Sequence, residues 1–290
     1  MLRARAAPTT MIDRPLASLQ AWTDAFHDAQ IPVLSSSAAE VERLALIEEE
    51  RGTVDAHTLA EAFAPDPLMT LRVLTDVSRY CTRLSVEPPE TLVGALVMQG
   101  IGPFFRSARG VPTVDFWLAA HPEAGAGLSR VVARARRAAH FALGFAIRRQ
   151  DEDASVIQEA ALLHDFAEML LWCHAPALAH TVASQLEADH TLRSADVQQA
   201  VLGITLDDLG QALMHRWQLP DLLIQTTDAR QSHRPKVQNV VLAVRLARHS
   251  RYGWDDPHAQ AALHDDAADV ARLLTLSPEA ATRLIMAMDG

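Results

Sequence analysis

Apolar residues recur along most of this chain at the three- and four-residue spacing of an amphipathic helix. The pattern starts with Leu16, Leu19, Trp22 and Phe26, and its longest stretch runs from about 128 to 149. The alternation of Val, Ile, Thr and Tyr that is typical of strands is missing, whereas alanine and leucine, which favour helices, are frequent. The pattern therefore predicts an all-α protein.

Several of the predicted helices begin at a residue that can cap them. Asp55 and Asp66 each precede an apolar periodic segment, and Pro67 then takes the first helical position, where its missing N–H costs nothing. Ser277 and the proline after it repeat this arrangement, and the serines at 35–37 are expected to cap the next helix as well. One helix is predicted to run from about 154 to 172. Further helices are expected over 193–201, 205–216, 220–229 and 235–250, followed by two short terminal helices.

Loop-forming residues indicate where the chain divides. Residues 1–14 carry no helical pattern and are expected to be a disordered tail, and glycine and proline are concentrated between 110 and 127. We therefore expect an N-terminal helical lobe over 15–120 and a second helical lobe over 121–232. Residues 233–290 are expected to add helices packed on the same body.

Composition restricts the classes of function. The chain has 26 basic and 36 acidic residues and a formal net charge of -10, which argues against a nucleic-acid partner. No uninterrupted apolar run approaches the roughly 18 residues of a membrane span, and no apolar segment of a signal peptide follows the first arginines. Cys81 and Cys173 lie too far apart in sequence for a zinc finger motif and suit a reducing cytosol. We expect a cytoplasmic protein without a membrane partner.

The dipeptide His164-Asp165, within an apolar segment predicted to be helical, is the sharpest chemical feature. An adjacent imidazole and carboxylate can both ligate a metal, or one can orient the other. Successive helical residues point about 100° apart, so other helices would have to complete such a site. On the residues alone, a buried and hydrogen-bonded core pair is the simpler interpretation. The similar run at 264–266 is interpreted as the polar start of a helix with a capping acid, and Trp217 as a core residue.

The surroundings of this dipeptide resemble the HDOD family, a bacterial signalling branch related to the HD superfamily of metal-dependent phosphohydrolases. The resemblance covers roughly residues 30 to 230 and depends on the order and spacing of several motifs. These are Ala161-Leu162-Leu163-His164-Asp165-Phe166, Pro65-Asp66-Pro67-Leu68 with Leu71 and Leu74, the segment 92–100, and Gly203, Gly210, Trp217 and Leu219-Pro220. The resemblance implies an all-helical fold in which an N-terminal helical lobe packs on an HD-like helical lobe.

The departures from the HD pattern concern its metal ligands. Arg134 stands where HD enzymes have a histidine on the helix before the His-Asp pair. Leu206 replaces a further histidine, and Arg245 replaces a distal aspartate. Only His164 and Asp165 are retained, and catalytic metals usually have three or more protein ligands and an open position. We expect no catalytic residue, no metal and no cofactor.

Arg134 has two interpretations. The resemblance places it in the degenerate cleft, where its guanidinium would pair with Asp165 in place of a metal cation. Its spacing from Arg130 and Arg137 also fits a solvated helix face.

Together these observations predict a non-catalytic, HDOD-type signal transduction module that acts through protein–protein interaction. Two alternatives stay open. One is a metal-dependent phosphohydrolase that acts on a nucleotide or cyclic dinucleotide through an unconventional ligand set around His164 and Asp165. The other is a sensor that binds a phosphorylated ligand near Arg134 in the degenerate cleft.

Overall fold

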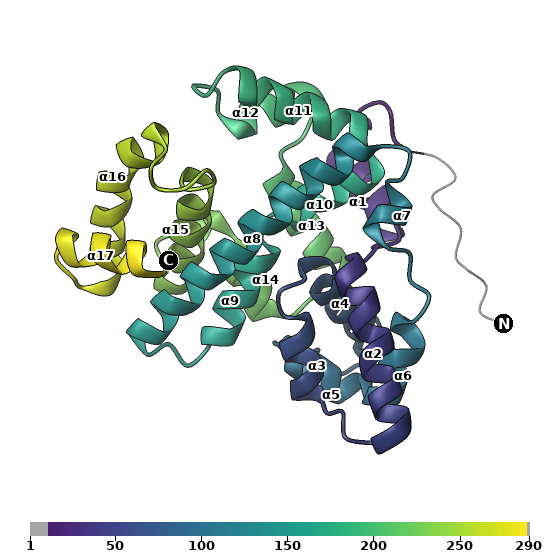
Figure 1. Cartoon of the computed structure of the whole chain (residues 1–290). Coiled ribbons are helices and arrows are strands. Elements are labelled where there is room, and N and C mark those ends of the chain that lie inside the picture. Colours follow the sequence, from purple (N-terminus) through teal and green to yellow (C-terminus); the bar gives the residue numbers. More distant parts are fainter. Residues whose placement is uncertain (1–10, 289–290) are drawn as a thin grey trace. The chain divides into compact units, whose positions relative to one another are not determined.

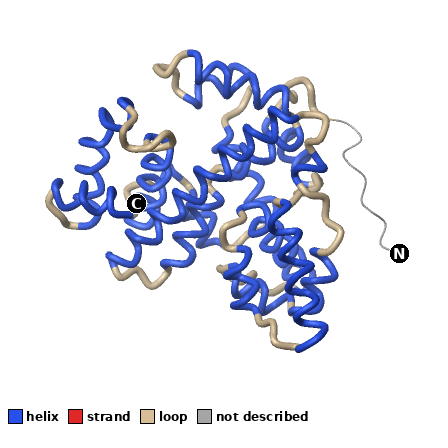
Figure 2. Tube along the Cα trace, in the orientation of Figure 1, coloured by secondary structure: helices blue, strands red, loops and turns tan. Residues whose placement is uncertain are grey.

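The computed structural model describes residues 11–288, and over this range the chain is built of helices and loops (Figures 1 and 2). Within those residues the only β-type pairing is a single bridge between Val33 and Thr113, so the predicted all-α class is confirmed. No helix in this range combines the length and the apolar character that a membrane crossing requires. Most of the predicted disordered tail lies outside the described residues, but Ile12 N–H donates to the carbonyl of His174 at 2.8 Å.

The chain forms two compact units, each built from two separate stretches. Unit 1 consists of the described residues up to Val132 and of Asp165–Pro220. Unit 2 consists of Ala133–His164 and of the described residues from Asp221 onward. Unit 1 therefore takes residues from both sides of the boundary expected near residue 120.

Helices of unit 1 are α1 (Leu19–His27), α2 (Ser35–Arg51), α3 (Ala56–Phe63), α4 (Pro67–Leu84), α5 (Leu92–Gln99), α6 (Ile101–Ala108), α7 (Val114–Trp117), α10 (Phe166–His174), α11 (Pro176–Ala188), α12 (Ser194–Leu202) and α13 (Leu206–Trp217). Helix α8 (Pro122–Arg149) begins in unit 1 and ends in unit 2. Unit 2 also contains α9 (Ala154–Leu163), α14 (Asp221–Thr227), the short 3-10 helix η1 (Ala229–Gln231), α15 (Pro235–His249), α16 (Pro257–Leu274) and α17 (Pro278–Met288).

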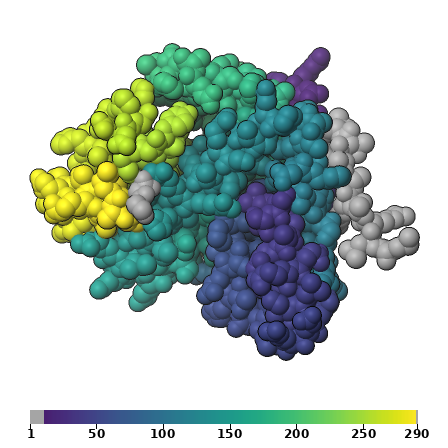
Figure 3. Space-filling model, in the orientation of Figure 1, coloured from purple at the N-terminus to yellow at the C-terminus, as the bar shows by residue number. Residues whose placement is uncertain are grey.

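Buried aromatic residues hold unit 1 together. The Trp22 ring is fully buried, and its Nε1–H donates to the carbonyl of Leu202 at 3.2 Å. Trp217 packs against Phe166 with ring centroids 5.7 Å apart and donates to the carbonyl of His27 at 3.3 Å. The space-filling view shows the purple and blue segments of unit 1, which include α2 to α5, lying against one another (Figure 3). Each buried indole thus satisfies its polar atom while filling the core.

Asp66 joins the starts of two helices. Its Oδ1 accepts the backbone N–H groups of Leu68 and Met69 at 2.9 and 3.1 Å, as an N-cap should. Its other oxygen accepts the N–H of Leu34 at 3.4 Å, and Ser37 also hydrogen bonds to this carboxyl. The cap predicted at Asp66 is confirmed. The serine cap predicted for α2 is wrong, because α2 already starts at Ser35 and Leu34 is its N-cap residue.

Helix α8 begins at Pro122, earlier than the predicted start near residue 128. The glycines that suggested a loop lie inside the helix. A Cβ added to Gly127 would lie 2.5 Å from the ring of Trp172, so the glycine permits close packing against α10. At Gly125 a Cβ would meet nothing within 4 Å. Close packing at Gly127 therefore explains one glycine that the sequence pattern assigned to a turn.

In unit 2, α15 packs against α9 and α16, and α16 packs against α17. The fully buried Asn239 donates from Nδ2 to the carbonyl of Ala142 at 3.1 Å and so ties α15 to α8. Helix α16 is 18 residues long, so the prediction of two short terminal helices is wrong for this one. The run at 264–266 lies in its interior. The interpretation of this run as the start of a helix with a capping acid is therefore also wrong, since Asp256 caps α16. Asp266 is buried there.

Candidate functional site

The His-Asp pair lies between two helices, and the single helix predicted from about 154 to 172 is interrupted there. His164 follows α9 and its N–H donates to Ala161 at 3.4 Å, a three-residue turn. Asp165 has φ -97° and ψ 21°, outside the helical region, and α10 starts at the next residue. The apolar pattern continues through both helices, which is why it concealed the break. Asp165 is 8% exposed, whereas His164 is partly exposed.

At two positions where the family resemblance expects metal ligands, the side chains are of another kind. Leu206 is a buried apolar residue in the first turn of α13, directly after its N-cap Thr205. Arg245 lies on α15 and is engaged by two carboxylates of α16. Its Nε lies 2.8 Å from Oδ1 of Asp266, and its Nη2 pairs with Asp269. Within residues 11–288, no three His, Cys, Asp or Glu side chains are grouped so that they could hold a metal ion.

The carboxylate of Asp266 also binds a histidine. His249 Nδ1 lies 2.6 Å from Oδ2 of Asp266, so one buried carboxylate contacts both Arg245 and His249. Asp269 in turn pairs with Arg272. A buried acid with an arginine and a histidine partner is typical of a structural polar network, here between α15 and α16.

Arg134 lies on α8 and is partly exposed. The position of its guanidinium relative to Asp165 stays a prediction. Its neighbour on the same helix, Arg130, lies 3.8 Å from Glu187 of α11 and is 56% exposed, as expected for a solvated helix face.

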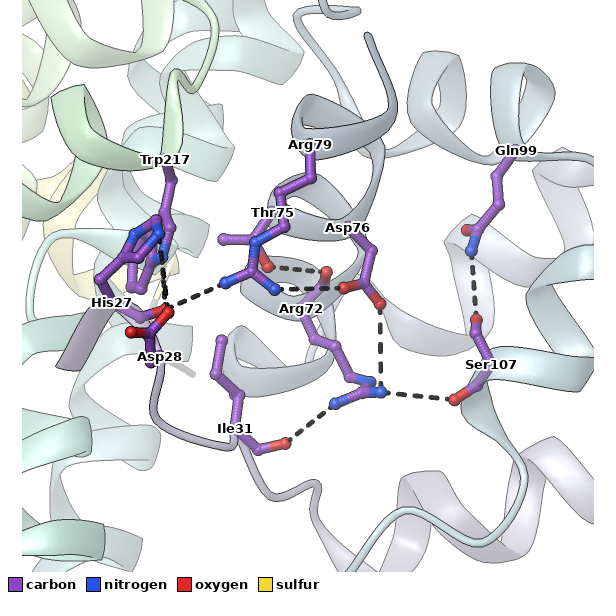
Figure 4. Close-up of polar contacts among 10 residues, drawn as sticks. All are labelled: His27, Asp28, Ile31, Arg72, Thr75, Asp76, Arg79, Gln99, Ser107 and Trp217. Atoms are coloured by element: carbon purple, nitrogen blue, oxygen red, sulfur yellow. Dashed lines mark hydrogen bonds and ion pairs between the residues drawn. The ribbon is translucent and has the colours of Figure 1, made fainter. Parts of the chain in front are cut away.

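A cavity of about 800 Å³ in unit 1 is the feature that the sequence analysis missed. Its walls come from the segment after α1, from α4, and from the end of α6 with the loop that follows it (Figure 4). The charged residues that line it are four arginines and two aspartates, namely Arg72, Arg79, Arg106, Arg109, Asp28 and Asp76.

Arg72 holds the three walls of this cavity together. Its Nη1 donates to the carbonyl of Ile31 at 3.5 Å, and its Nη2 donates to the carbonyl of Ser107 at 3.4 Å. The side chain is 12% exposed and lies 4.0 Å from Asp76 on the same helix. One guanidinium therefore joins α4 to the segment after α1 and to the end of α6 (Figure 4).

Arg79 lies two turns further along α4. Its Nη2 donates to the carbonyl of His27 at 3.0 Å, the same carbonyl that accepts from Trp217. Its Nη1 lies 3.9 Å from Asp76, and the side chain is 41% exposed. Asp76 thus stands about 4 Å from two guanidiniums, beyond the distance of a charge-assisted hydrogen bond to either.

The other two arginines differ in how they are neutralised. Arg109 lies 2.8 Å from Glu49 and 3.4 Å from Glu42, both on α2. Arg106 is exposed in the last turn of α6 and makes no ion pair within the part of the chain that the structure describes. Arg106 is therefore a cation of the wall without a carboxylate partner, and Arg79 shares the carboxylate of Asp76 with Arg72.

A second hollow of about 420 Å³ lies beside Arg79, which lines both. His27, Arg216 and Trp217 are among its lining residues. Burial is the main cause that lowers the pKa of His27, so this imidazole favours its neutral form.

The sequence carried only a weak signal of this cavity. Arg72 and Arg79 are seven residues apart, and Arg106 and Arg109 are three apart. Each spacing predicts that the two arginines of a pair lie on the same face of a helix. Such spacing is equally typical of a solvated helix face. The two pairs become one site only because the fold brings α4 to the end of α6.

Comparison with known proteins agrees with the family resemblance of the sequence motifs. The HDOD domain family model matches residues 31–235. The response regulator MmoQ from Methylococcus capsulatus is similar in structure, with a TM-score of 0.67 and 18% identity, and the match covers 89% of this chain and 99% of that one. A virulence factor from Campylobacter jejuni gives a TM-score of 0.65 at 18% identity, covering 92% and 90%. No curated protein matches. At these identities the neighbours show a shared helical fold.

Proposed function

Because this chain belongs to the HDOD domain family, we propose that it is a non-catalytic signalling module of a bacterial cytoplasm that acts by binding a protein partner. One of its structural neighbours is described as a response regulator, which is consistent with a role in signal transduction.

The observation that carries the proposal is the engagement of Arg245. This residue stands where the family resemblance expects an aspartate ligand, and its guanidinium is 35% exposed and paired with two carboxylates. A cation fixed at that position opposes a divalent metal by charge, and the buried Asp266 is already neutralised by it. Leu206, buried and apolar, has no ligand atom to offer.

A hydrolysis assay tests the non-catalytic part of the proposal. The purified protein is incubated with manganese, magnesium or ferrous iron and with bis(p-nitrophenyl) phosphate or a cyclic dinucleotide. We expect no turnover above the rate in buffer. His180→Ala is the matched control for His164→Ala, because His180 is an exposed histidine of α11. Turnover that persists in His180→Ala and disappears in His164→Ala would establish the phosphohydrolase alternative.

A binding experiment tests the protein-partner part. The full chain is used to capture proteins from a lysate of the organism that produces it. Each captured protein is then purified and titrated against the chain by calorimetry. We expect at least one direct complex of fixed stoichiometry, with the same affinity for wild type and His164→Ala. Absence of any direct complex among the captured proteins contradicts the proposal.

A further inference from the structure

We propose that the arginine-lined cavity of unit 1 is a binding site for a phosphorylated small molecule. The cavity is formed by α4, by the end of α6 and by the segment after α1, and its volume is about 800 Å³. This site is distinct from the His164-Asp165 pair and does not depend on the protein partner proposed above.

The cavity wall has an excess of positive charge, although the whole molecule is negatively charged. Four arginines line it against two aspartates, in a chain with a net charge of -10. Asp28 is 88% exposed, so solvent screens most of its effect. Asp76 is the remaining acid and stands between Arg72 and Arg79. The wall therefore keeps a local excess of positive charge, which attracts an anion.

The arginines divide into those that build the site and those that can bind. Arg72 already donates to two backbone carbonyls, and Arg109 is paired with two glutamates of α2. Arg79 donates to one carbonyl and is 41% exposed, so some of the five N–H groups of its guanidinium still face solvent. Arg106 is exposed without an ion-pair partner among the described residues. Arg79 and Arg106 are thus the residues that would hold the anion.

The number of cations and the size of the cavity indicate the class of ligand. One bidentate arginine satisfies a carboxylate, whereas the three terminal oxygens of a phosphate accept from two or more guanidiniums at once. The volume lies within the roughly 300–1,000 Å³ of small-molecule sites, far more than a single anion fills. Uncharged residues of the wall, among them Ile31, Thr75 and Val111, leave space for the rest of the molecule.

Isothermal titration calorimetry at low salt, with inorganic pyrophosphate, ATP and adenosine as probes, tests this proposal. We expect saturable binding of pyrophosphate and of ATP with a dissociation constant of about 1 mM or lower, and no binding of adenosine. Tighter binding of ATP than of pyrophosphate identifies a nucleotide as the ligand class. Equal affinities identify the phosphate group as the recognised part.

Matched variants locate the binding. Arg79→Gln and Arg106→Gln are each expected to weaken pyrophosphate binding at least about tenfold, because each removes charge-assisted hydrogen bonds. Arg79→Gln removes the hydrogen bond to the carbonyl of His27 and could therefore disturb the fold. Arg106 is exposed, so Arg106→Gln is expected to keep the fold and tests the site independently. Arg130→Gln removes the same charge outside the cavity and is expected to have no effect. The proposal is overturned if neither phosphate compound binds, if adenosine binds as well as ATP, or if Arg106→Gln and Arg130→Gln weaken binding equally.

Discussion

Lowering the pH from 7 to 5 is expected to destabilise the fold through His174. This residue ends α10 and is 8% exposed, with its ring 5.5 Å from that of Trp117 and 5.8 Å from that of Phe26. Its Nε2–H donates to the carbonyl of Gln30 at 3.0 Å. The neutral ring satisfies this contact, and burial lowers the pKa of His174 from 6.5 to about 4.

The sign of the effect follows from which state binds the proton. Between pH 6.5 and about 4 the unfolded chain protonates His174 and the folded chain does not. Stability is therefore lost as the pH falls through this interval. With these two pKa values, the linkage relation gives a loss of about 2 kcal/mol between pH 7 and pH 5.

Urea unfolding of wild type and His174→Gln at pH 7 and pH 5 measures this loss. Glutamine does not titrate and keeps an N–H donor for the carbonyl of Gln30. The variant is expected to lose about 2 kcal/mol less than wild type between the two pH values, and any remaining slope belongs to other groups such as His27. The exposed His180 on α11 supplies a control for the exchange of histidine for glutamine, because His180→Gln alters no buried contact. Equal losses in wild type and His174→Gln would refute the reasoning.

Four substitutions test the capping, packing and burial described above, each by its free energy of unfolding in urea. Asp66→Ala removes the N-cap of α4 and leaves buried donors without an acceptor, so we expect a loss of about 2–4 kcal/mol; a loss below about 0.5 kcal/mol contradicts the cap. Gly127→Ala places a Cβ 2.5 Å from the ring of Trp172 and is expected to cost about 1–3 kcal/mol. Its neighbour Gly125→Ala meets nothing within 4 Å and is expected to gain about 0.5–1 kcal/mol, so equal effects of the two glycine variants would exclude close packing. Asp165→Ala removes a buried carboxyl that has partners, with an expected loss of about 1–3 kcal/mol, whereas unchanged stability favours a functional role for Asp165.

Local chemistry explains why much of the fold was predictable. A cap and the N–H groups that it accepts lie within four residues, so Asp55, Asp66 and Ser277 act as the sequence indicated. The apolar periodicity likewise placed most of the helices, because an amphipathic stripe is required wherever a helix packs on a core. The order of motifs along the chain also indicated the HDOD family, and the family model that matches residues 31–235 confirms that family.

The errors arose where packing overrides local preference. Glycines near residue 125 indicate a loop, yet Gly127 lies inside α8, where the ring of Trp172 occupies the space that a side chain would need. The helix break at His164 and Asp165 was concealed because both flanking helices are apolar, so the pattern shows no interruption. The polar run at 264–266 suggests a helix start, and only the approach of α15 to α16 shows that Asp266 pairs with Arg245.

The sequence alone thus determined the helical class, several helix starts and the family, since each depends on residues that are close in the chain or on the order of motifs along it. The tertiary structure decided which charges meet. Arg72 contacts the carbonyls of Ile31 and Ser107, which are 41 and 35 residues away, and Arg245 meets Asp266 across a turn. These pairings depend on how helices pack, and a charge on a helix looks the same in the sequence whether it faces water or a cavity. The arginine-lined cavity therefore became visible only when α4, the end of α6 and the segment after α1 were placed together.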